Sequence, residues 1–358
     1  MTRGIRCAWM RGGTSKGALF LAEDLPSDDA ARDDLLLRVM GSPDPRQIDG
    51  LGGAHPLTSK VGVVSVSDDP DADVDYLFLQ VVVDRPVVST SQTCGNILAA
   101  VAPFALERGL LPTTDGVTDV RVRMVNTGAL ATLHVRTPGG VVTYDGDVAI
   151  TGVPGTAAPV EVDVEPSGAP LLPTGRTTDR LAGVDVTCID NGMPSVIVRA
   201  ADVGLSGAED PDALEADPAL AEKVRAIRTA AADAMGLETD LERTTTPKIV
   251  FVAPPAAGGT ILTRSFIPVH VHRAIGVLGA ATVAAAAALP GTTAYGVARL
   301  GDDGGALRIE HPTGYLDVGI ATTDDPAPAV TRTTLVRTAR MLLDGVVYPG
   351  PARTTRPV

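Results

Sequence analysis

The sequence is poor in aromatic residues and short of positive charge. Phe, Trp and Tyr make up 3% of its 358 residues, so the core must be built from aliphatic side chains. Its 43 Asp and Glu residues outnumber its 30 Lys and Arg residues, which gives a formal net charge of −13. A surface with this balance neither neutralises nucleic-acid phosphates nor lies on anionic lipid. We therefore expect no nucleic acid and no membrane among the partners.

Cysteines and long apolar runs are also scarce. The 3 cysteines, Cys7, Cys94 and Cys188, show no CxxC spacing, and their odd number supports no disulfide framework. The longest apolar run, Ile275–Leu289, is shorter than the ~20 residues of a membrane-spanning helix. Charges within Met1–Trp9 interrupt any signal-peptide core. We expect a cytoplasmic protein with free thiols.

The length and the 44% hydrophobic content suit two domains of ordinary size. Short β-branched runs bounded by turn residues predict strands at Val61–Ser67, Val74–Asp84, Val120–Met124, Ala131–Thr137, Val141–Ile150, Val160–Val164, Val184–Ile189 and Val196–Ala200. Helical periodicity predicts helices at Asp28–Met40, Cys94–Arg108, Pro211–Met235, Ala274–Leu289 and Val330–Asp344. Strands outnumber helices without regular βαβ alternation, so we expect an α+β fold.

Two of these helices indicate an internal duplication. Gly95–Leu106 and Ala274–Leu289 are apolar around their circumference, so each must be wrapped by protein on all sides. Similar strand pairs follow each helix, one around Asn126-Thr127-Gly128 and the other around Pro312-Thr313-Gly314. We expect each helix to be the centre of its own domain.

The boundary between the domains is expected near the Pro/Gly/Thr-rich stretch Glu165–Arg180. The first domain then covers residues 1–183, with Lys60 and Cys94, and the second covers residues 184–358.

Cys94 is the strongest candidate for chemistry. It lies in Ser91-Gln92-Thr93-Cys94-Gly95-Asn96, where a polar turn gives way to the first buried helix. Helix-terminal amides and nearby cations lower a thiol pKa from about 8.5 to roughly 3.5–7.5, which suits a general base or a nucleophile. The alternative is a small buried hydrophobe, which better explains Cys7 and Cys188 in their predicted strands.

Lys60 ends His55-Pro56-Leu57-Thr58-Ser59-Lys60 and leads straight into a predicted strand. Most lysines are solvated surface charges. A lysine beside a cysteine instead stabilises the thiolate, and partial burial lowers the lysine pKa toward a value useful for proton transfer. Both interpretations stay open from the sequence.

Two turns lie near the start of the two halves. Arg11-Gly12-Gly13-Thr14-Ser15-Lys16-Gly17 is either an anion cradle or a hairpin turn whose glycines need positive φ. The turn does not match the P-loop pattern, because Lys16 is followed by Gly17 and not by Ser or Thr. Asp190-Asn191-Gly192-Met193-Pro194-Ser195 is also a turn between predicted strands. The duplication predicts that both turns face a shared cleft.

Two of the histidines, His270 and His272, lie on one face of the strand-like segment Phe266–His272. No carboxylate or third histidine is linked to them by spacing, so no metal site is expected. Hydrogen bonding to a substrate is the preferred hypothesis for one of them.

Several motifs together resemble the PrpF protein family and span most of the chain. They are Trp9–Gly17, Gly41–Gly53, Thr58-Ser59-Lys60-Val61, Cys94-Gly95-Asn96-Ile97, Asn126-Thr127-Gly128, Asn191-Gly192-Met193-Pro194 and Pro247-Lys248. The resemblance implies a diaminopimelate epimerase-like fold, with two similar domains, each a curved sheet wrapped around one buried helix, and the active site between them. This agrees with the duplication.

The resemblance also implies an activity. Family members are isomerases of unsaturated tri- and tetracarboxylates that use no metal or organic cofactor, and a lysine and a cysteine matching Lys60 and Cys94 are implicated in proton transfer. Epimerases of this fold have a second cysteine at the second buried helix; Ile275–Ala280 has none, so a two-cysteine mechanism is not expected. The expected contacts to substrate carboxylates or to the enolate oxygen are Arg11, Thr14, Ser15, Gly95, Asn96, Asn191, Met193, Lys248 and His272.

Within the family, Ser265–Pro268, His272 and Ile275–Gly279 are more similar to the 4-oxalomesaconate tautomerase branch of gallate and protocatechuate catabolism. The methylaconitate isomerase branch is the runner-up. The expected reaction is a keto–enol or allylic proton shift on a small polycarboxylate, and a homodimer is compatible with the sequence. A non-catalytic anion-binding protein is the alternative from another class, and no histidine is tied to Cys94 for hydrolase chemistry.

Overall fold

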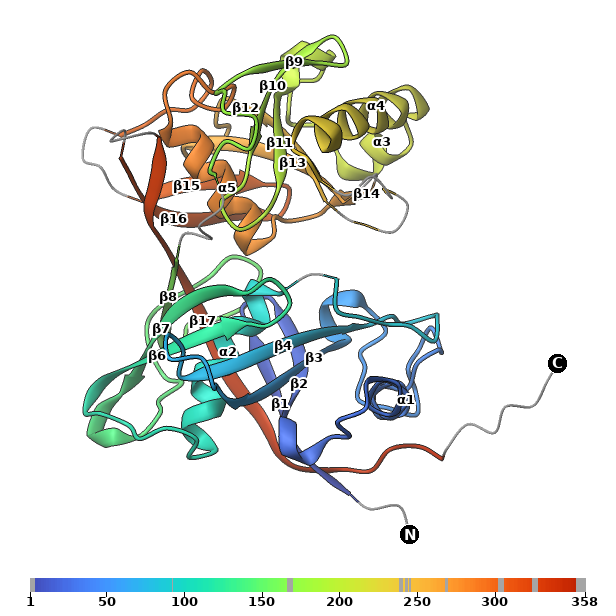
Figure 1. The fold of residues 1–358 in the computed structure, drawn as a ribbon, viewed down its shortest axis with the longest axis vertical. Coiled ribbons are helices and arrows are strands. Elements are labelled where there is room, and N and C mark those ends of the chain that lie inside the picture. Colours follow the sequence, from blue (N-terminus) through green and yellow to red (C-terminus); the bar gives the residue numbers. More distant parts are fainter. Residues whose placement is uncertain are drawn as a thin grey trace, which may run out of the picture. The chain divides into compact units, whose positions relative to one another are not determined.

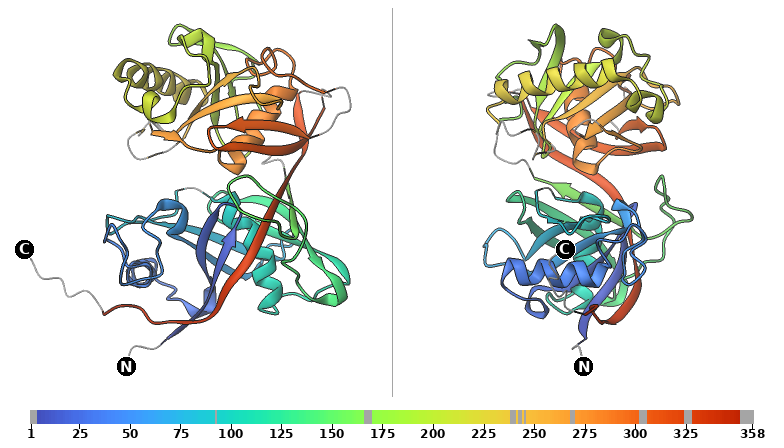
Figure 2. Two further views of the ribbon diagram at one scale, coloured as in Figure 1. Left: turned by 180° about the vertical axis from the view of Figure 1, so that it is seen from behind. Right: turned by 90° about the vertical axis from the view of Figure 1, so that its right-hand side faces the viewer.

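The computed structural model describes residues 4–91, 93–165, 170–237, 241, 244, 246–267, 270–301, 306–323 and 328–351. The chain divides into two compact units, one of Met1–Val162 with Arg337–Val358 and one of Asp163–Val336 (Figure 1). It passes from one unit to the other in two strands, β8 (Pro159–Val164) and β17 (Ala329–Val347). The path of β17, red in the figures, can be followed in two further views (Figure 2).

This division differs from the expected boundary after residue 183. Residues from Asp163 on already belong to the second unit, and the chain returns to the first unit at Arg337. The reason is β17, which pairs with β16 (Gly314–Thr323) of the second unit and then with β1 (Ile5–Gly12) of the first. A strand that continues from one unit into the other contains no turn residues at the crossing, so composition does not reveal the boundary.

The first unit is a curved sheet with one helix inside. Its further strands are β2 (Ser15–Leu21), β3 (Lys60–Val66), β4 (Val74–Val81), β5 (Val88–Ser89), β6 (Gly116–Met124) and β7 (Ala129–Thr137), and its helices are α1 (Asp29–Met40) and α2 (Gly95–Glu107). α2 packs against β1, β2, β3, β4 and β7. The expected helix at Asp28–Met40 is confirmed, with the Asp28 side chain accepting from the Ala31 amide at its start.

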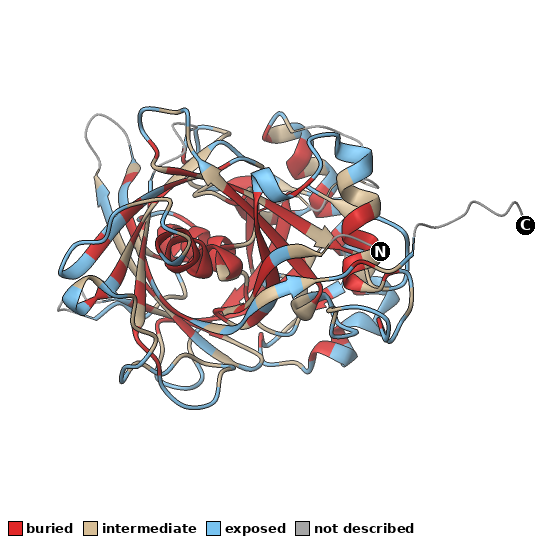
Figure 3. Ribbon diagram, turned by 90° about the horizontal axis from the view of Figure 1, so that it is seen from below, coloured by how far each residue is buried: buried red, intermediate tan, exposed pale blue. Residues whose placement is uncertain are grey.

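α2 is the helix at the centre of this unit. Gly95 and every residue from Ile97 to Leu106 are buried. A helix that is apolar on all sides is stable only when protein surrounds it, and the view coloured by burial shows such a helix ringed by strands (Figure 3). The expected buried helix is confirmed, with Cys94 immediately before it.

The second unit has the same plan. Its strands are β9 (Asp179–Leu181), β10 (Val184–Ile189), β11 (Ser195–Arg199), β12 (Lys248–Ala253), β13 (Ile261–Ile267), β14 (His270–His272) and β15 (Leu307–His311), and its helices are α3 (Pro211–Glu215), α4 (Pro218–Ala234) and α5 (Val277–Ala288). α5 is buried from Val277 to Ala287 and packs against β10, β11, β15 and β16. Its many alanines let the surrounding strands approach closely.

The two units repeat one connectivity. In the first, antiparallel β1–β2, parallel β2–β3, antiparallel β3–β4, parallel β4–β6 and antiparallel β6–β7 follow one another. In the second, β10–β11, β11–β12, β12–β13, β13–β15 and β15–β16 alternate in the same way. α2 and α5 enter at the same point, before the third antiparallel pair. The internal duplication inferred from the sequence is confirmed.

Two segments contradict the expected secondary structure. Val330–Asp344, expected as a helix, lies within β17, because β16 and β1 supply hydrogen-bond partners and its Thr and Val residues favour strands. Val141–Ile150, expected as a strand, has only the bridge between Val148 and Ala157. Turn-forming Asp145–Asp147 interrupts that run.

Two further segments differ in detail. Pro211–Met235, expected as one helix, is two, because the Asp217 side chain accepts from the Ala219 and Leu220 amides and begins α4 anew. The stretch expected to separate the domains lies inside the second unit, and its residues 166–169 are outside the described part of the chain.

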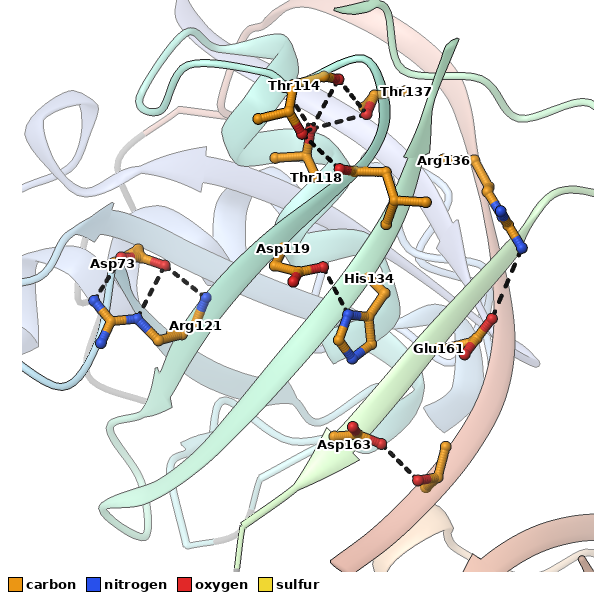
Figure 4. A network of polar contacts seen from close by, with 12 residues as sticks. Asp73, Thr114, Thr118, Asp119, Arg121, His134, Arg136, Thr137, Glu161 and Asp163 are labelled. Carbon is orange, nitrogen blue, oxygen red and sulfur yellow. Dashed lines mark hydrogen bonds and ion pairs between the residues drawn. The ribbon is translucent and has the colours of Figure 1, made fainter.

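Polar pairs join neighbouring strands on the solvent side of the first unit (Figure 4). Asp119 of β6 lies opposite His134 of β7, and their side chains are 2.7 Å apart. Arg121 reaches Asp73 at 2.9 Å. The helices that the structure describes are all too short or too polar to cross a membrane.

Candidate active site

Cys94 lies at the start of α2, where extended backbone (φ −129°, ψ 101°) turns into the helix. Its carbonyl oxygen accepts from the Leu98 amide at 2.9 Å and from the Tyr76 hydroxyl at 3.3 Å, while its side chain makes no capping hydrogen bond. The first amides of a helix lack intrahelical partners and carry the positive end of its dipole. An oxyanion bound beside these amides is therefore stabilised.

The other two cysteines lack such a setting. Cys7 is 1% exposed and Cys188 is 0% exposed, whereas Cys94 is partly exposed. Burial raises the pKa of Cys7 to about 11 and that of Cys188 to about 12. Both thiols stay protonated at neutral pH, so Cys94 is the one candidate for thiolate chemistry among the three.

Lys60 opens β3 and is only 7% exposed. Its Nζ donates to Gln80 Oε1 at 2.7 Å and lies 4.9 Å from the centre of the Phe78 ring. Among the described residues, no carboxylate neutralises this ammonium group. A buried cation without a counter-ion favours the binding of an anion beside it.

Lys60 and Cys94 belong to the same interior. A Cβ added to Gly62 would lie 3.5 Å from the Ile97 side chain of α2, and one added to Gly17, which pairs with Lys60 on β2, would lie 3.2 Å from it. Alternate residues of a strand share a face, so Lys60 lies on the face that encloses α2. Since Ile97 is in the first turn of α2, Lys60 is level with the end of the helix at which Cys94 lies.

The hairpin between β1 and β2 lies directly on the start of α2. A Cβ on Gly12 would lie 2.4 Å from the Asn96 carbonyl oxygen, and one on Gly13 would lie 2.2 Å from Asn96 Oδ1. Gly13 has φ 51°, so the expectation of a glycine turn with positive φ is confirmed. Asn96 Nδ2 donates to Thr14 Oγ1 at 3.2 Å, which brings two of the predicted contact residues together.

Two buried hydroxyl groups near this point have no partner among the described residues. They are Ser15 Oγ, in a residue 1% exposed, and Thr93 Oγ1, in a residue 8% exposed. A buried unsatisfied polar group costs about 1–3 kcal/mol, so an arrangement that keeps two is suited to a ligand with hydrogen-bonding oxygens. Ser15 was among the predicted contacts and Thr93 was not, because no spacing distinguishes it from other polar turn residues.

Arg11 lies on the opposite face of the hairpin from Gly12, its neighbour in the strand. Its Nη1 donates to Thr338 O at 2.9 Å, Thr338 Oγ1 at 2.9 Å and Gly13 O at 3.1 Å. These bonds fasten the hairpin to β17. The structure therefore does not bring Arg11 to the start of α2 with the other predicted contacts.

In the second unit, the Asn191–Met193 turn lies on α5 as the hairpin lies on α2. A Cβ on Gly192 would lie 3.5 Å from the Leu278 side chain. Asn191 Nδ2 donates to the Ala281 carbonyl oxygen at 3.2 Å, and the Met193 carbonyl oxygen accepts from Thr282 Oγ1 at 3.2 Å. Both turns of the duplication thus contact the beginning of their buried helix.

Lys248 corresponds to Lys60 in the repeat, because each opens the strand that follows a parallel connection. It is 7% exposed, and its amide donates to the Pro194 carbonyl oxygen at 2.9 Å. The start of α5, Gly276, has no thiol where α2 has Cys94. The duplicated unit thus keeps the lysine and lacks the cysteine.

His272 lies in β14, opposite Ser265, and its Nδ1 accepts from the Ala274 amide at 2.9 Å. His270, two residues earlier, is exposed and lies 3.7 Å from a Glu215 oxygen. Within the described ranges, no three His, Cys, Asp or Glu side chains gather as metal ligands. Next to the turn, Asp190 Oδ1 is buried without a recorded partner, a feature that the sequence did not indicate.

Comparison with known proteins gives a consistent picture. The family model described as PrpF protein matches residues 2–349. The chain is 53% identical over 347 residues to the "(4E)-oxalomesaconate Delta-isomerase" of Novosphingobium sp. (strain KA1). The matched region covers 96% of each chain. The chain is 50% identical over 351 residues to the "4-oxalomesaconate tautomerase" of Pseudomonas putida, which covers 97% of this chain and 96% of the relative.

Solved structures support the fold. The crystal structure of a methylitaconate-delta-isomerase is 34% identical, covers 100% of both chains and has a TM-score of 0.85. A probable proline racemase from Agrobacterium radiobacter, 18% identical over 96% of this chain and 92% of its own, has a TM-score of 0.57 and shares the fold alone. The expected epimerase-like fold, with two similar domains around buried helices, is confirmed.

Proposed function

Because the chain belongs to the PrpF protein family, we propose that this isomerase acts on 4-oxalomesaconate and shifts a proton along its conjugated carbons. The two relatives named for this compound, at 53% and 50% identity, support the choice of substrate. The observation that supports the chemistry is that Cys94 lies at the start of α2 and the buried Lys60 lies on the sheet that encloses this helix.

The reaction needs a base and a group that holds negative charge. A proton next to a carbonyl group, or conjugated to it through a double bond, is acidic because the carbanion delocalises into a dienolate. One of Cys94 and Lys60 removes this proton, and the other, or the same group, returns a proton at the far end of the conjugated system. Substrate and product contain the same atoms, so no redox partner or organic cofactor is needed.

The start of α2 supplies the electrostatic stabilisation. The amides of Gly95 and Asn96 and the hydroxyl groups of Ser15 and Thr93 are available to carboxylate or enolate oxygens. Donors that are held in place before reaction stabilise developing charge without reorganisation. Where Cys94 is the base, Lys60 adds a positive charge to these donors.

Asn191, Met193, Lys248 and His272 remain proposed substrate contacts, as expected from the family resemblance. A homodimer and a cytoplasmic location also remain proposals, and the free state of all 3 cysteines is compatible with a reducing compartment.

Proton NMR in D₂O tests the proposed function directly. The purified protein is incubated separately with 4-oxalomesaconate and with methylaconitate, the substrate of the runner-up branch. We expect isomerisation and deuterium incorporation with 4-oxalomesaconate. Turnover of methylaconitate alone would support the runner-up.

A second arm separates an enzyme from an anion-binding protein. Cys94→Ser keeps the size of the side chain and removes the thiol. Lost turnover with retained substrate binding supports an enzyme. Binding without turnover by the wild-type protein would contradict the proposal.

A further inference from the structure

A pocket lies in the first unit, on the opposite face of the β1–β2 hairpin from Ser15. It has a volume of about 470 Å³, and Arg11, Lys16, Arg340 and Tyr144 are among the residues that line it. This volume is within the range of about 300–1,000 Å³ typical of small-molecule sites. Nothing in the proposed isomerase reaction uses it.

Three cationic side chains form a row along this pocket. Arg11 of β1 lies opposite Lys16 of β2 on one side and opposite Arg340 of β17 on the other. Directly opposed residues of antiparallel strands share a face, and like charges in such positions destabilise the sheet. The burial of Arg11 and the charge of Arg340 both lower the Arg11 pKa.

The row is unusual in a chain with 43 acidic against 30 basic residues. Elsewhere in this unit Arg121 pairs with Asp73 at 2.9 Å and Arg136 with Glu161 at 3.9 Å (Figure 4). Over the described part of the chain, no such partner is recorded for Lys16 or for Arg340, although Asp145 lines the same pocket. The positive charge is therefore left for something outside the chain.

A hydroxyl group adds a directional donor. The Tyr144 hydroxyl is buried and has no hydrogen-bond partner within the described residues. Burial and the charge of Glu107 raise the pKa of Tyr144, so the group stays protonated. An unsatisfied donor beside cations without a carboxylate partner fits an acceptor with several negatively charged oxygens.

We propose that this pocket binds a small multivalent oxyanion at Lys16 and Arg340, with the charge of Arg11 between them and the Tyr144 hydroxyl as a further donor. Phosphate and a small polycarboxylate share this chemistry. The site is distinct from the start of α2, because Arg11 and Ser15 lie on opposite faces of the hairpin. The inference does not depend on the isomerase activity.

Binding can be measured on the full chain by calorimetry and by thermal unfolding at low salt, with inorganic phosphate and tricarballylate as separate probes. A probe that binds the folded state raises Tm as the probe concentration increases. A bound anion also relieves the repulsion among the three cations, which raises Tm further. The double variant Lys16→Gln/Arg340→Gln is expected to bind at least tenfold more weakly than the wild type. Both side chains are exposed, so the variant is expected to fold.

Arg225→Gln is the matched control, because it removes an exposed arginine from α4 of the second unit. It is expected to bind like the wild type. Phosphate binding that the double variant loses identifies a phosphate group as the ligand of this pocket. Tricarballylate binding that the double variant loses identifies a polycarboxylate instead. Tricarballylate binding that Ser15→Ala abolishes and the double variant retains belongs to the start of α2 and overturns the proposal. So does failure of both probes to bind the wild type at millimolar concentration.

Discussion

Lys60 and Gln80 lie opposite each other on β3 and β4, and the lysine Nζ donates a 2.7 Å hydrogen bond to Gln80 Oε1. The Gln80 amide group is itself held, because its Nε2 donates to the Ser59 carbonyl oxygen at 2.8 Å. The glutamine thus orients the lysine and leaves the ammonium group without a negative partner. Gln80 is a positioning residue for the proposed proton transfer.

Gln80→Met keeps the bulk of the side chain and removes the acceptor. We expect kcat to fall by roughly 10–100-fold, since small displacements of a reacting group have effects of this size. Gln80→Glu instead places a carboxylate against Lys60, which neutralises the cation at the proposed anion site, so we expect KM to rise and kcat to fall. Unchanged kcat and KM in Gln80→Glu, measured by steady-state kinetics, would show that Gln80 has only a structural role.

Much of the fold could be predicted from the sequence because burial leaves a direct pattern. α2 and α5 are apolar on all sides, and only enclosure explains such helices. β17 was mistaken for a helix because its stability depends on two neighbouring strands that are far away in sequence. The domain boundary was misplaced for the same reason.

The candidate site was predictable where a residue stands at the end of an element. Cys94 immediately precedes α2 and Lys60 is the first residue of β3, and the structure brings both to the interior around α2. Gln80 was missed because its role arises from strand register. The sequence also did not reveal on which face of the hairpin Arg11 lies, since a shift of one residue along a strand moves a side chain to the opposite face.

Thiol alkylation should distinguish Cys94 from the other cysteines. Treatment with iodoacetamide near neutral pH is expected to modify Cys94 first. Activity is expected to fall in proportion to the fraction of Cys94 that is modified. Burial and the raised pKa values of about 11 and about 12 keep Cys7 and Cys188 unreactive in the folded protein. Peptide mass spectrometry alongside residual activity tests this, and early labelling of Cys188 would contradict it.

Metal chelation is expected to leave activity intact. In the proposed mechanism, enolisation requires only a base and anion-binding donors, the roles assigned to Cys94, Lys60 and the start of α2. Activity is compared before and after prolonged incubation with EDTA and removal of the chelator. Loss of activity that a divalent ion restores would refute the proposed mechanism.

Asp190 gives a prediction about stability and pH. Burial raises its pKa, although the amides of Gly192 and Met193 act in the opposite direction. The folded-state pKa therefore exceeds the unfolded value of about 3.9, and the stability associated with the protonated form is lost as pH rises through the folded pKa. Asp190→Asn removes this loss, so its Tm is expected to exceed that of the wild type at pH 7 and to approach it near pH 4.

Calorimetric unfolding across this pH range tests the prediction. Asp233→Asn, at an exposed position near the end of α4, is the matched control and should change Tm little at either pH. A Tm gain in Asp190→Asn that is equal at pH 4 and pH 7 would show that ionisation is not its cause.

The central prediction concerns the two proton-handling groups. Lys60→Met and Cys94→Ala are each expected to lower kcat by roughly 10²–10⁴-fold, the usual effect of a positioned acid or base. Lys60 is buried without a recorded counter-ion among the described residues, so its replacement by an apolar side chain should not lower Tm. Lost activity with undiminished stability separates a catalytic role from a structural one.

Matched variants complete the experiment. Lys223→Met removes an exposed lysine from α4, and Cys7→Ala removes a buried thiol from β1; both are expected to keep kcat near the wild-type value. The comparison uses kcat at saturating 4-oxalomesaconate, with circular dichroism and Tm as checks of folding. If Lys60→Met and Cys94→Ala both fold and retain near-normal kcat, neither group transfers the proton and the proposed mechanism is wrong. The unpartnered hydroxyl groups of Ser15 and Thr93 could not take over this role by themselves. A neutral hydroxyl group is too weak a base at neutral pH unless an adjacent base activates it.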